Sequence, residues 1–467
     1  MKKRPNILFI MTDEQKANCI GYNNKDVITP NLDALKNDSI NFCNGYTTNP
    51  SCVPARAAMF SGKYPSLCGA PAYITPLESN ETTFMTRLKN SGYHTAVFGK
   101  QHFAGADVEH GYVEETIVDN HYPHFDEENA YTRFLKANGF SKNEELLEID
   151  DKFTWKWIAD EKYHVDAFVG DNGARWIKEN ANMDKPWFFT LSFLGPHQPY
   201  NGINLSTESL YDETEFTLPK SVQDDLKNKP NYYMDQLLTG SGNPGQMPVI
   251  NATEDHIRHT LKSYYSTMSF IDQKIGIVID ELKKSGQYDN TIIFYTSDHG
   301  DYMGEYGMFG KGQYLSQALM RVPLLMKPAI KDFEGRDDYR VAYNYDIAPT
   351  CLAAAEVNIP KEMTAKSLLP LIKKVNLTRE EIDHQITYLE ASNVRGIIRD
   401  NFKLYYYCDR EYGELYDLKN DPEERFNLYK EDKYLKVKLE LKELLLDKLI
   451  YLGRNSSSPW NYSAPLI

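Results

Sequence analysis

Short, largely apolar runs alternate along the chain with longer stretches that have helical spacing. The clearest runs cover residues 6–11, 95–98, 187–194 and 291–295. A continuous apolar run of this length is typical of a strand whose two faces are both buried in a parallel sheet. The four runs therefore predict interior strands.

The stretches between these runs carry apolar residues at helical intervals. Helices are predicted over residues 29–40, 81–90, 165–180 and 255–284. Thr29 and Pro30 open the first, and its apolar side is formed by Leu32, Leu35 and Ile40. Strands that alternate with helices predict an α/β domain with a doubly wound, mixed or parallel sheet.

The pattern changes after about residue 375. Short strands are predicted over residues 396–399 and 403–407, and a helix over residues 434–446. We therefore expect a large catalytic domain over residues 1–375 and a smaller C-terminal α+β domain over residues 376–467.

Two long stretches interrupt the alternation, at about residues 104–160 and 200–254, the second with a glycine-rich run at 240–245. Insertions of this length in a compact domain often shape a binding site. Aromatic side chains that could stack on a sugar, although they more often belong to the core, are Tyr73, Tyr122, Trp155 and Trp157.

Composition narrows the function classes. The chain has 467 residues, of which 41% are hydrophobic, so a large core is expected. Its formal charge of -14 argues against broad nucleic-acid binding and against a basic membrane-binding surface. Any anion that the protein binds must therefore meet a local cluster of cations.

No stretch is long enough to cross a membrane. The apolar run after Lys2, Lys3 and Arg4 is too short for a signal peptide, so a cytoplasmic location is expected. The six cysteines show neither zinc-binding spacing nor a disulfide pattern, which predicts free thiols for five of the six, Cys52 being the exception.

Polar residues follow the predicted strands directly. Asp13 and Glu14 follow the first, Lys100 and His102 the second, His197 the third, and Asp298 and His299 the fourth. Ligand-binding groups in open α/β sheets gather at the carboxyl ends of the strands. We therefore expect these side chains to meet at one edge of the sheet.

The segment Cys52-Val53-Pro54-Ala55-Arg56 is the sharpest local signal. Pro54 suits the first turn of a helix, so Cys52 would lie at a helix N-terminus, where the helix dipole favours an anion. Arg56 lies one turn further on and can reach back to the same point. Taken alone, such a cysteine is as often a buried structural thiol as a reactive one.

This Cys-x-Pro-x-Arg segment resembles the signature of type I sulfatases, in which the cysteine is converted to formylglycine, and these enzymes belong to the alkaline-phosphatase superfamily. Further blocks resemble the family in the same order along the chain. They are RPNILFIMTDEQ, TPNLDAL, CVPARAAMFSGKYP, GYHTAVFGKQH, FLGPHQPY, TIIFYTSDHGDYMGEYGMFGKG, RVPLLMKP and ELYDLKNDPEERFNL.

The resemblance implies a divalent cation held by Asp13, Asp298, His299 and the modified Cys52, with Glu14 as a further candidate ligand. It also implies a sulfate-binding set formed by Arg56, Lys100, His102, His197 and Lys311. Many family members have Asp in place of Glu14 and Asn in place of His299. The Asp298-His299 pair resembles the branch with phosphonate monoester hydrolases, and an imidazole ligand favours Mn²⁺ beside the Ca²⁺ common in the family.

The implied reaction removes sulfate from a sulfated carbohydrate. A hydroxyl of the hydrated formylglycine attacks sulfur, His197 and Lys311 protonate the leaving alcohol, and His102 starts the release of sulfate. A formylglycine-generating enzyme is the implied maturation partner. The alternatives are a phosphonate, phosphate or aryl sulfate hydrolase with the same site, an inactive glycan-binding homologue, and a cysteine hydrolase with an unmodified thiol.

Overall fold

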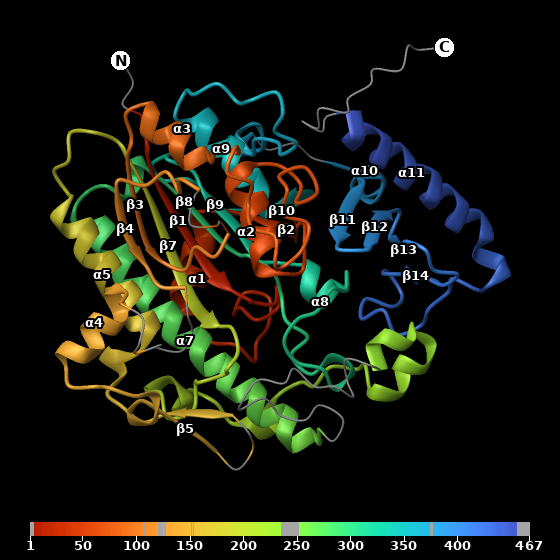
Figure 1. Cartoon of the computed structure of the whole chain (residues 1–467), viewed down its shortest axis with the longest axis horizontal. Helices are drawn as coiled ribbons and strands as arrows, with labels where there is room; N and C mark the ends of the chain where they lie inside the picture. The colour runs from red at the N-terminus through yellow and green to blue at the C-terminus, as the bar shows by residue number, and fades with distance from the viewer. Residues whose placement is uncertain are drawn as a thin grey trace.

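The computed structural model describes residues 4–103, 105, 108–119, 125, 128–150, 152, 154–234, 252–373 and 377–454. Its centre is an eight-stranded sheet with the order β10-β2-β9-β8-β1-β7-β3-β4 (Figure 1). The strands are β1 (Asn6–Asp13), β2 (Ile40–Tyr46), β3 (His94–Gly99), β4 (Glu114–Ile117), β7 (Trp187–Pro196), β8 (Thr291–Ser297), β9 (Leu324–Lys327) and β10 (Arg336–Tyr343).

Neighbouring strands of this sheet run parallel except at β9, which is antiparallel to both β2 and β8. The central strand β1 is buried along its whole length. Ile7 and Phe9 face one apolar core, whereas Leu8 and Ile10 face another. This explains why the strand is a continuous apolar run, and it confirms the predicted doubly wound α/β fold.

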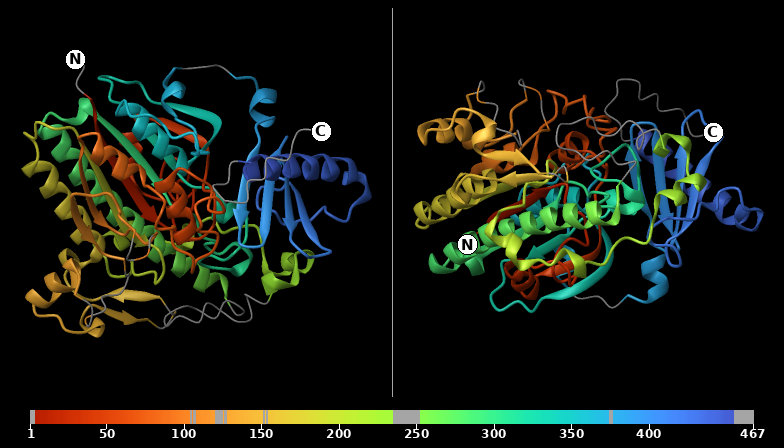
Figure 2. Two further views of the ribbon diagram at one scale, coloured as in Figure 1. Left: turned by 45° about the horizontal axis from the view of Figure 1, so that its top comes forward. Right: turned by 90° about the horizontal axis from the view of Figure 1, so that it is seen from below.

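Helices cover both faces of the sheet. The core around Leu8 and Ile10 is closed by α1 (Pro30–Asn37), α5 (Val165–Glu179) and α7 (Glu254–Lys284). The opposite core is closed by α2 (Cys52–Ser61), α3 (Phe84–Asn90) and α9 (Ile347–Ala354). Figure 2 shows the long green helix α7 running lengthwise beside the sheet.

The four predicted strands and the helices over 165–180 and 255–284 are confirmed. Two helix boundaries are wrong. The first helix ends at Asn37, and Ile40 instead begins strand β2, where its side chain is buried under the sheet. The second helix begins only at Phe84, because Thr83 caps it by accepting a hydrogen bond from the Thr86 backbone N–H.

The first insertion contains regular elements. They are β4, α4 (Ala130–Ala137) and the small hairpin of β5 (Leu147–Ile149) and β6 (Trp155–Trp157), and β4 extends the main sheet beside β3. The described part of the second insertion has short 3-10 turns over Ser206–Leu210, Glu213–Glu215 and Gln223–Asn228. The run at 240–245 and Tyr122 lie outside the described residues.

The C-terminal region forms a separate antiparallel sheet, which Figure 1 shows in blue beside the main sheet. It consists of β11 (Thr387–Ala391), β12 (Val394–Arg399), β13 (Phe402–Tyr407) and β14 (Gly413–Asp417), covered by α11 (Leu435–Arg454). Two short helices, α8 (Gln317–Met320) and α10 (Arg379–Asp383), precede it. The smaller C-terminal α+β region is thus confirmed, whereas its boundary at 375 and 376 falls outside the described residues and stays a prediction.

One apolar core joins the two sheets. Phe9 and Phe60, on the side of the main sheet, belong to the same buried cluster as Leu389 and Leu404 of the C-terminal sheet. None of the six cysteines, all of which are described, forms a disulfide. None of the described helices is both long and apolar enough to cross a membrane.

Candidate active site

The carboxyl ends of β1 and β8 bring the predicted acidic residues together. Asp13 is the last residue of β1, and Asp298 follows the last residue of its neighbour β8. The Asp298 Oδ1 atom accepts hydrogen bonds from the backbone N–H groups of Glu14 (3.0 Å) and His299 (2.9 Å). Adjacent parallel strands therefore place both carboxylates, fully buried, at one point.

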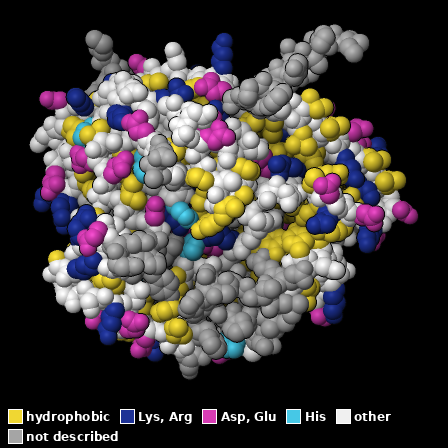
Figure 3. Space-filling model, in the orientation of Figure 1, with side chains coloured by type: hydrophobic (Ala, Val, Ile, Leu, Met, Phe, Trp, Pro, Cys, Tyr) yellow, Lys and Arg dark blue, Asp and Glu magenta, His cyan; other side chains and the backbone are white. Residues whose placement is uncertain are grey.

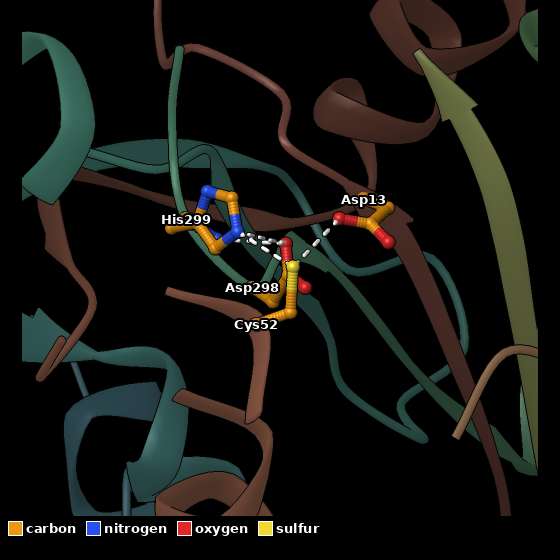
Figure 4. Close-up of side chains that lie close together, drawn as sticks. All are labelled: Asp13, Cys52, Asp298 and His299. Atoms are coloured by element: carbon orange, nitrogen blue, oxygen red, sulfur yellow. Dashed lines mark hydrogen bonds and ion pairs between the residues drawn. The ribbon is translucent and has the colours of Figure 1, made fainter. Parts of the chain in front are cut away.

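Cys52 reaches this point from the opposite side, at the N-terminus of α2. Its Sγ atom lies 3.6 Å from Asp13 Oδ1 and 3.1 Å from His299 Nε2. One ligand atom from each of Asp13, Cys52, Asp298 and His299 lies within 4.8 Å of the others. Figure 4 shows the four side chains pointing toward one another.

The chemistry of these four side chains fits a divalent cation. The His299 Nδ1 atom lies 2.9 Å from the Gly300 carbonyl oxygen, which can only accept, so Nδ1 carries the hydrogen. This leaves Nε2, the atom that faces Cys52, as the ligand, in the arrangement usual for metal-binding histidines. Two carboxylate oxygens and one imidazole suit Mn²⁺ or Ca²⁺.

Arg56 lies under the cluster and is fully buried. Its Nε donates to Asp298 Oδ2 (2.7 Å), and its Nη2 lies 3.5 Å from Asp13 Oδ2. Its Nη1 donates to the Lys100 carbonyl oxygen (2.9 Å) and to Ser192 Oγ (3.1 Å). Arg56 therefore fixes both carboxylates and links them to β3 and β7.

Three further cations surround the cluster. The Lys100 Nζ atom forms an ion pair with Asp13 Oδ2. Lys311 Nζ lies 2.7 Å from Glu14 Oε2 and 2.6 Å from His197 Nε2. His197 Nε2 lies 3.0 Å from the same Glu14 oxygen. Glu14 thus gathers His197 and Lys311, while its buried Oε1 atom has no hydrogen-bond partner in the described part of the chain.

His102 follows β3 in a left-handed backbone conformation with a φ of 42°. The Asp119 Oδ1 atom accepts hydrogen bonds from the backbone N–H groups of Gln101 (2.7 Å) and His102 (3.2 Å), which hold this turn. The ring of Tyr73 packs edge-on against the imidazole, with ring centroids 5.6 Å apart. Among the described residues, no hydrogen bond or ion pair joins His102 to the four-residue cluster, but Lys100 connects the two along the chain.

Opposing effects set the ionisation of the site. Burial and Asp13 raise the pKa of the Cys52 thiol, but Lys311, Lys100 and His299 together bring it well below its usual range. Burial lowers the pKa of His299, whereas Asp298 and Cys52 raise it to about 9. Burial and Lys311 lower the pKa of His197, and Glu14 and Asp13 raise it to about 9. The His197 imidazole therefore stays protonated at neutral pH.

The charges of the site formally cancel without a metal ion. This holds for the carboxylates of Asp13, Glu14 and Asp298 against the cations of Arg56, Lys100 and Lys311, before the two histidines and the Cys52 thiol are counted. A bound divalent cation would leave a net positive charge. That charge would attract an anionic ester in a chain that is otherwise strongly acidic.

The sequence did not point to several residues that support this site. Ser192 and Asp119 hold Arg56 and His102, and the Asn344 amide donates to the carbonyl oxygens of Ser297 (3.0 Å) and Asp298 (3.1 Å). Asp301 accepts from the Gly310 N–H (2.9 Å), directly before Lys311. Ser192 lies within a predicted strand and Asp301 lies shortly after another, so these two residues are the ones that the strand pattern could have indicated.

Comparison with known proteins agrees with this geometry. The family model described as Sulfatase matches residues 5–357. A second model, described as N-sulphoglucosamine sulphohydrolase, C-terminal, matches residues 304–450. Together the two models cover the main sheet, the cluster and the C-terminal sheet.

Similar proteins extend along almost the whole chain. An uncharacterized sulfatase of Escherichia coli, YidJ, is 31% identical over 95% of this chain and 87% of its own length. An arylsulfatase of Clostridium perfringens is 29% identical over 96% of this chain and 94% of its own length.

Solved structures share the fold. A phosphonate monoester hydrolase from Silicibacter pomeroyi aligns with a TM-score of 0.82 at 21% identity, over 97% of this chain and 96% of that chain. A structure in complex with its substrate D-glucosamine-2-N,6-O-disulfate aligns with a TM-score of 0.76 at 22% identity, over 97% of this chain and 99% of that chain. The chain therefore belongs to the sulfatase family, whose enzymes hydrolyse sulfate esters.

Proposed function

We propose that this sulfatase removes sulfate from a sulfated carbohydrate, with a formylglycine made from Cys52 as nucleophile and one divalent cation. The observation that carries the proposal is the convergence of position 52, two carboxylates and an imidazole within 4.8 Å, surrounded by buried cations. A cation held by Asp13, Asp298, His299 and residue 52 would make a hydroxyl of the hydrated aldehyde more acidic and would neutralise the sulfate.

The chain's own residues orient the nucleophile. Position 52 begins α2, so the helix dipole favours negative charge there. The neighbouring Pro54 and Arg56 lie in the first turns of this fully buried helix, and Arg56 is fixed by its bonds to Asp298 and Lys100. The nucleophile is thus held with little freedom, which favours reaction with a bound ester.

Lys100, Lys311 and His197 supply positive charge on the other side of position 52. The Lys311 and His197 nitrogens lie 2.6 Å apart and share one oxygen of Glu14. A protonated group here can hold a proton for the alcohol that leaves, and the raised pKa of His197 keeps that proton at neutral pH. His102, at the end of β3, is the proposed base that starts sulfate release.

The carbohydrate preference is supported by relatives. The structure with D-glucosamine-2-N,6-O-disulfate shares the fold, and an N-acetylglucosamine-6-O-sulfatase of Bacteroides thetaiotaomicron is 25% identical over 95% of this chain. The phosphonate monoester hydrolase fold supports the alternative, a phosphonate ester hydrolase with the same site. A silent glycan-binding role would leave the intact cluster without a purpose.

A second candidate is a cysteine hydrolase with an unmodified thiol. The 3.1 Å separation of Cys52 Sγ from His299 Nε2 and the lowered pKa of the thiol favour it. However, Asp13 Oδ1 lies 3.6 Å from the sulfur, and a buried carboxylate there opposes a thiolate unless a cation lies between them. Labelling of residue 52 separates the two candidates: in the peptide that contains it, an aldehyde reacts with a hydrazide probe, whereas a thiol reacts with iodoacetamide after denaturation.

The substrate class is tested with protein co-expressed with a formylglycine-generating enzyme, its proposed maturation partner. The panel contains sulfated mono- and disaccharides, an aryl sulfate and a phosphonate monoester. We expect the best saccharide to exceed the aryl sulfate in kcat/KM after correction for the better aryl leaving group. A phosphonate turned over faster than every sugar would make the phosphonate hydrolase the better assignment.

A further inference from the structure

We infer that Tyr73 and Ile74 form the surface on which the sugar ring of the substrate lies during sulfate removal. This inference rests on the proposed carbohydrate substrate and adds the part of the site that selects the leaving group. Three observations support it. Tyr73 lies beside His102, both side chains are exposed, and hydrogen bonds fix the turn in which they lie.

Both side chains are unusually exposed for apolar residues beside a buried site. Ile74 is 86% exposed, the largest fraction for any large hydrophobic side chain in the described part of the chain, and Tyr73 is 49% exposed. Burying such side chains against a ligand removes apolar surface from water, which stabilises the complex. Exposed apolar residues next to catalytic groups are therefore candidates for ligand contact.

The turn that carries them is closed by its own hydrogen bonds. Thr75 Oγ1 donates to the Ala72 carbonyl oxygen (2.7 Å) and accepts from the Ala72 N–H (2.9 Å), and the Thr75 N–H donates to the same carbonyl (3.0 Å). Tyr73 and Ile74 are the two residues between these anchors, so both side chains stand at the tip. A preformed turn loses little conformational entropy when a ligand binds.

The turn is also fixed to the segment that carries His102. The Leu77 N–H donates to the Phe103 carbonyl oxygen (2.8 Å). The ring of Phe103 in turn packs on Phe60 of the nucleophile helix α2, with centroids 4.6 Å apart. The tip therefore keeps a fixed position relative to Cys52, which begins the same helix.

Contact with His102 places the tip beside a residue of the proposed active site. The Tyr73 and His102 rings meet edge to face at 5.6 Å and 76°. The edge contact occupies only part of the Tyr73 surface, since half of the residue remains exposed. Near the middle of one face of the molecule, Figure 3 shows histidine side chains, basic side chains and a hydrophobic cluster lying together.

The chemistry of this surface suits a pyranose ring. One side of a pyranose carries mainly C–H groups, whereas its hydroxyls point outward. A tyrosine offers a rigid apolar face with a polar tip, and so matches both parts of such a ligand at low entropic cost. Ile74 would extend the apolar contact, and the sulfate would lie toward the buried cations.

The test uses Tyr73→Ala and Tyr73→Phe in the matured full-length enzyme, with the best sulfated saccharide of the panel. For Tyr73→Ala we expect KM to rise about tenfold with kcat within about twofold, because the stacking of the sugar on the ring stabilises the ground state and the transition state equally. Tyr73→Phe keeps the ring and should change KM by less than about threefold.

Two inhibitors show which part of the substrate the surface contacts. The inhibition constant of the desulfated saccharide should rise with KM in Tyr73→Ala, whereas that of inorganic sulfate should not change. Ile74→Ala should give a smaller rise of the same kind. Tyr339→Ala removes a tyrosine of equal exposure (50%) on β10 and is the matched control, expected to change nothing.

The possible results are distinguishable. If wild-type enzyme turns over sulfated sugars and Tyr73→Ala leaves KM unchanged, the inference is overturned and the proposed function stands. A fall in kcat with unchanged KM would also overturn it, because Tyr73 would then act only by positioning His102. If wild-type enzyme turns over no sulfated sugar, the proposed function and the inference fall together.

Discussion

Two clusters of buried charge in this protein differ in how their charges are paired. The proposed catalytic cluster gathers Asp13, Arg56, Lys100, Asp298 and His299 at the strand ends of the main sheet. The second cluster, which we call the tyrosine cluster, lies where the C-terminal sheet meets the catalytic domain. Its members are Lys229, Tyr233, Tyr306, Lys403, Tyr405, Tyr407, Glu414, Tyr416 and Glu424.

In the tyrosine cluster, the charges are surrounded by fixed partners. Lys229 Nζ lies over three tyrosine rings, at 4.5 to 4.9 Å from their centroids, and donates to Tyr416 Oη (2.8 Å). Glu414 accepts from the hydroxyls of Tyr407 and Tyr416. No ligand is needed to satisfy this arrangement.

In the catalytic cluster, several ligand atoms instead point at one shared position. Asp13, Cys52, Asp298 and His299 face one another (Figure 4). The comparison shows that burial of charge alone does not mark an active site. The distinguishing feature of the proposed active site is that several potential ligand atoms lie close enough together to bind one cation.

The largest expected effect follows from replacing one of the proposed cation ligands. Asp298→Asn keeps an oxygen for the N–H groups of Glu14 and His299 but removes one negative charge from the cation site. We expect kcat/KM to fall by more than about 100-fold, with loss of bound metal. Substitution of residues that merely hydrogen-bond to metal ligands already lowers metal affinity or activity by up to about 100-fold. Metal content by mass spectrometry and kinetics measure both. An enzyme that keeps its metal and its activity would remove Asp298 from the ligand set.

A substitution in the tyrosine cluster should change the stability of the protein rather than its activity. Glu414→Gln leaves Lys229, whose Nζ lies 3.5 Å from the Glu414 carboxylate, buried without a charged partner. Breaking such a pair should lower the free energy of unfolding by about 3 kcal/mol, while kcat stays within about threefold. Urea denaturation and kinetics on the same preparation test this. A large loss of kcat with unchanged stability would abolish the distinction between the clusters.

A smaller effect is expected from the loop that presents Lys311. The Tyr200 hydroxyl donates to Asp301 Oδ2 (2.7 Å) and accepts from the Gly310 N–H (3.0 Å). Tyr200→Phe removes both bonds, and the resulting displacement of Lys311 should lower kcat about tenfold with a stability loss of about 1 kcal/mol. Kinetics and thermal denaturation measure these effects. Unchanged kcat would show that Asp301 alone holds the loop.

The smallest effect concerns His102. Asp119→Ala removes the acceptor that holds the Gln101 and His102 N–H groups, and should lower kcat about fivefold by releasing the strained turn. Asp119→Asn keeps an acceptor oxygen and should restore most of the rate. If kcat falls equally in both variants, the charge of Asp119 is what matters, and its proposed role in positioning His102 through hydrogen bonds is wrong.

The fold was predictable where burial dictates the sequence pattern. β1, β7 and β8 are buried on both faces, so each is a continuous apolar run. β10 was missed because it lies at the sheet edge and carries polar residues, and β9 because it is only four residues long. The antiparallel direction of β9 leaves no trace in the sequence.

The site was predictable in outline for a related reason. Residues directly after buried strands reach one edge of the sheet, and this brings Asp13 and Asp298 to Cys52. The pairing of Glu14 with Lys311 and His197 could not be foreseen, because Lys311 lies on an irregular loop. The roles of these residues stay predictions.

The central claim is that Cys52 is converted to the catalytic aldehyde. The most direct test is peptide mass spectrometry of protein co-expressed with the maturation enzyme, combined with turnover of the best substrate by wild type and Cys52→Ala. We predict that the peptide carries the aldehyde or its hydrate and that Cys52→Ala is inactive with an unchanged melting temperature. Full activity of a preparation whose Cys52 is entirely thiol, or of Cys52→Ala, would contradict the account.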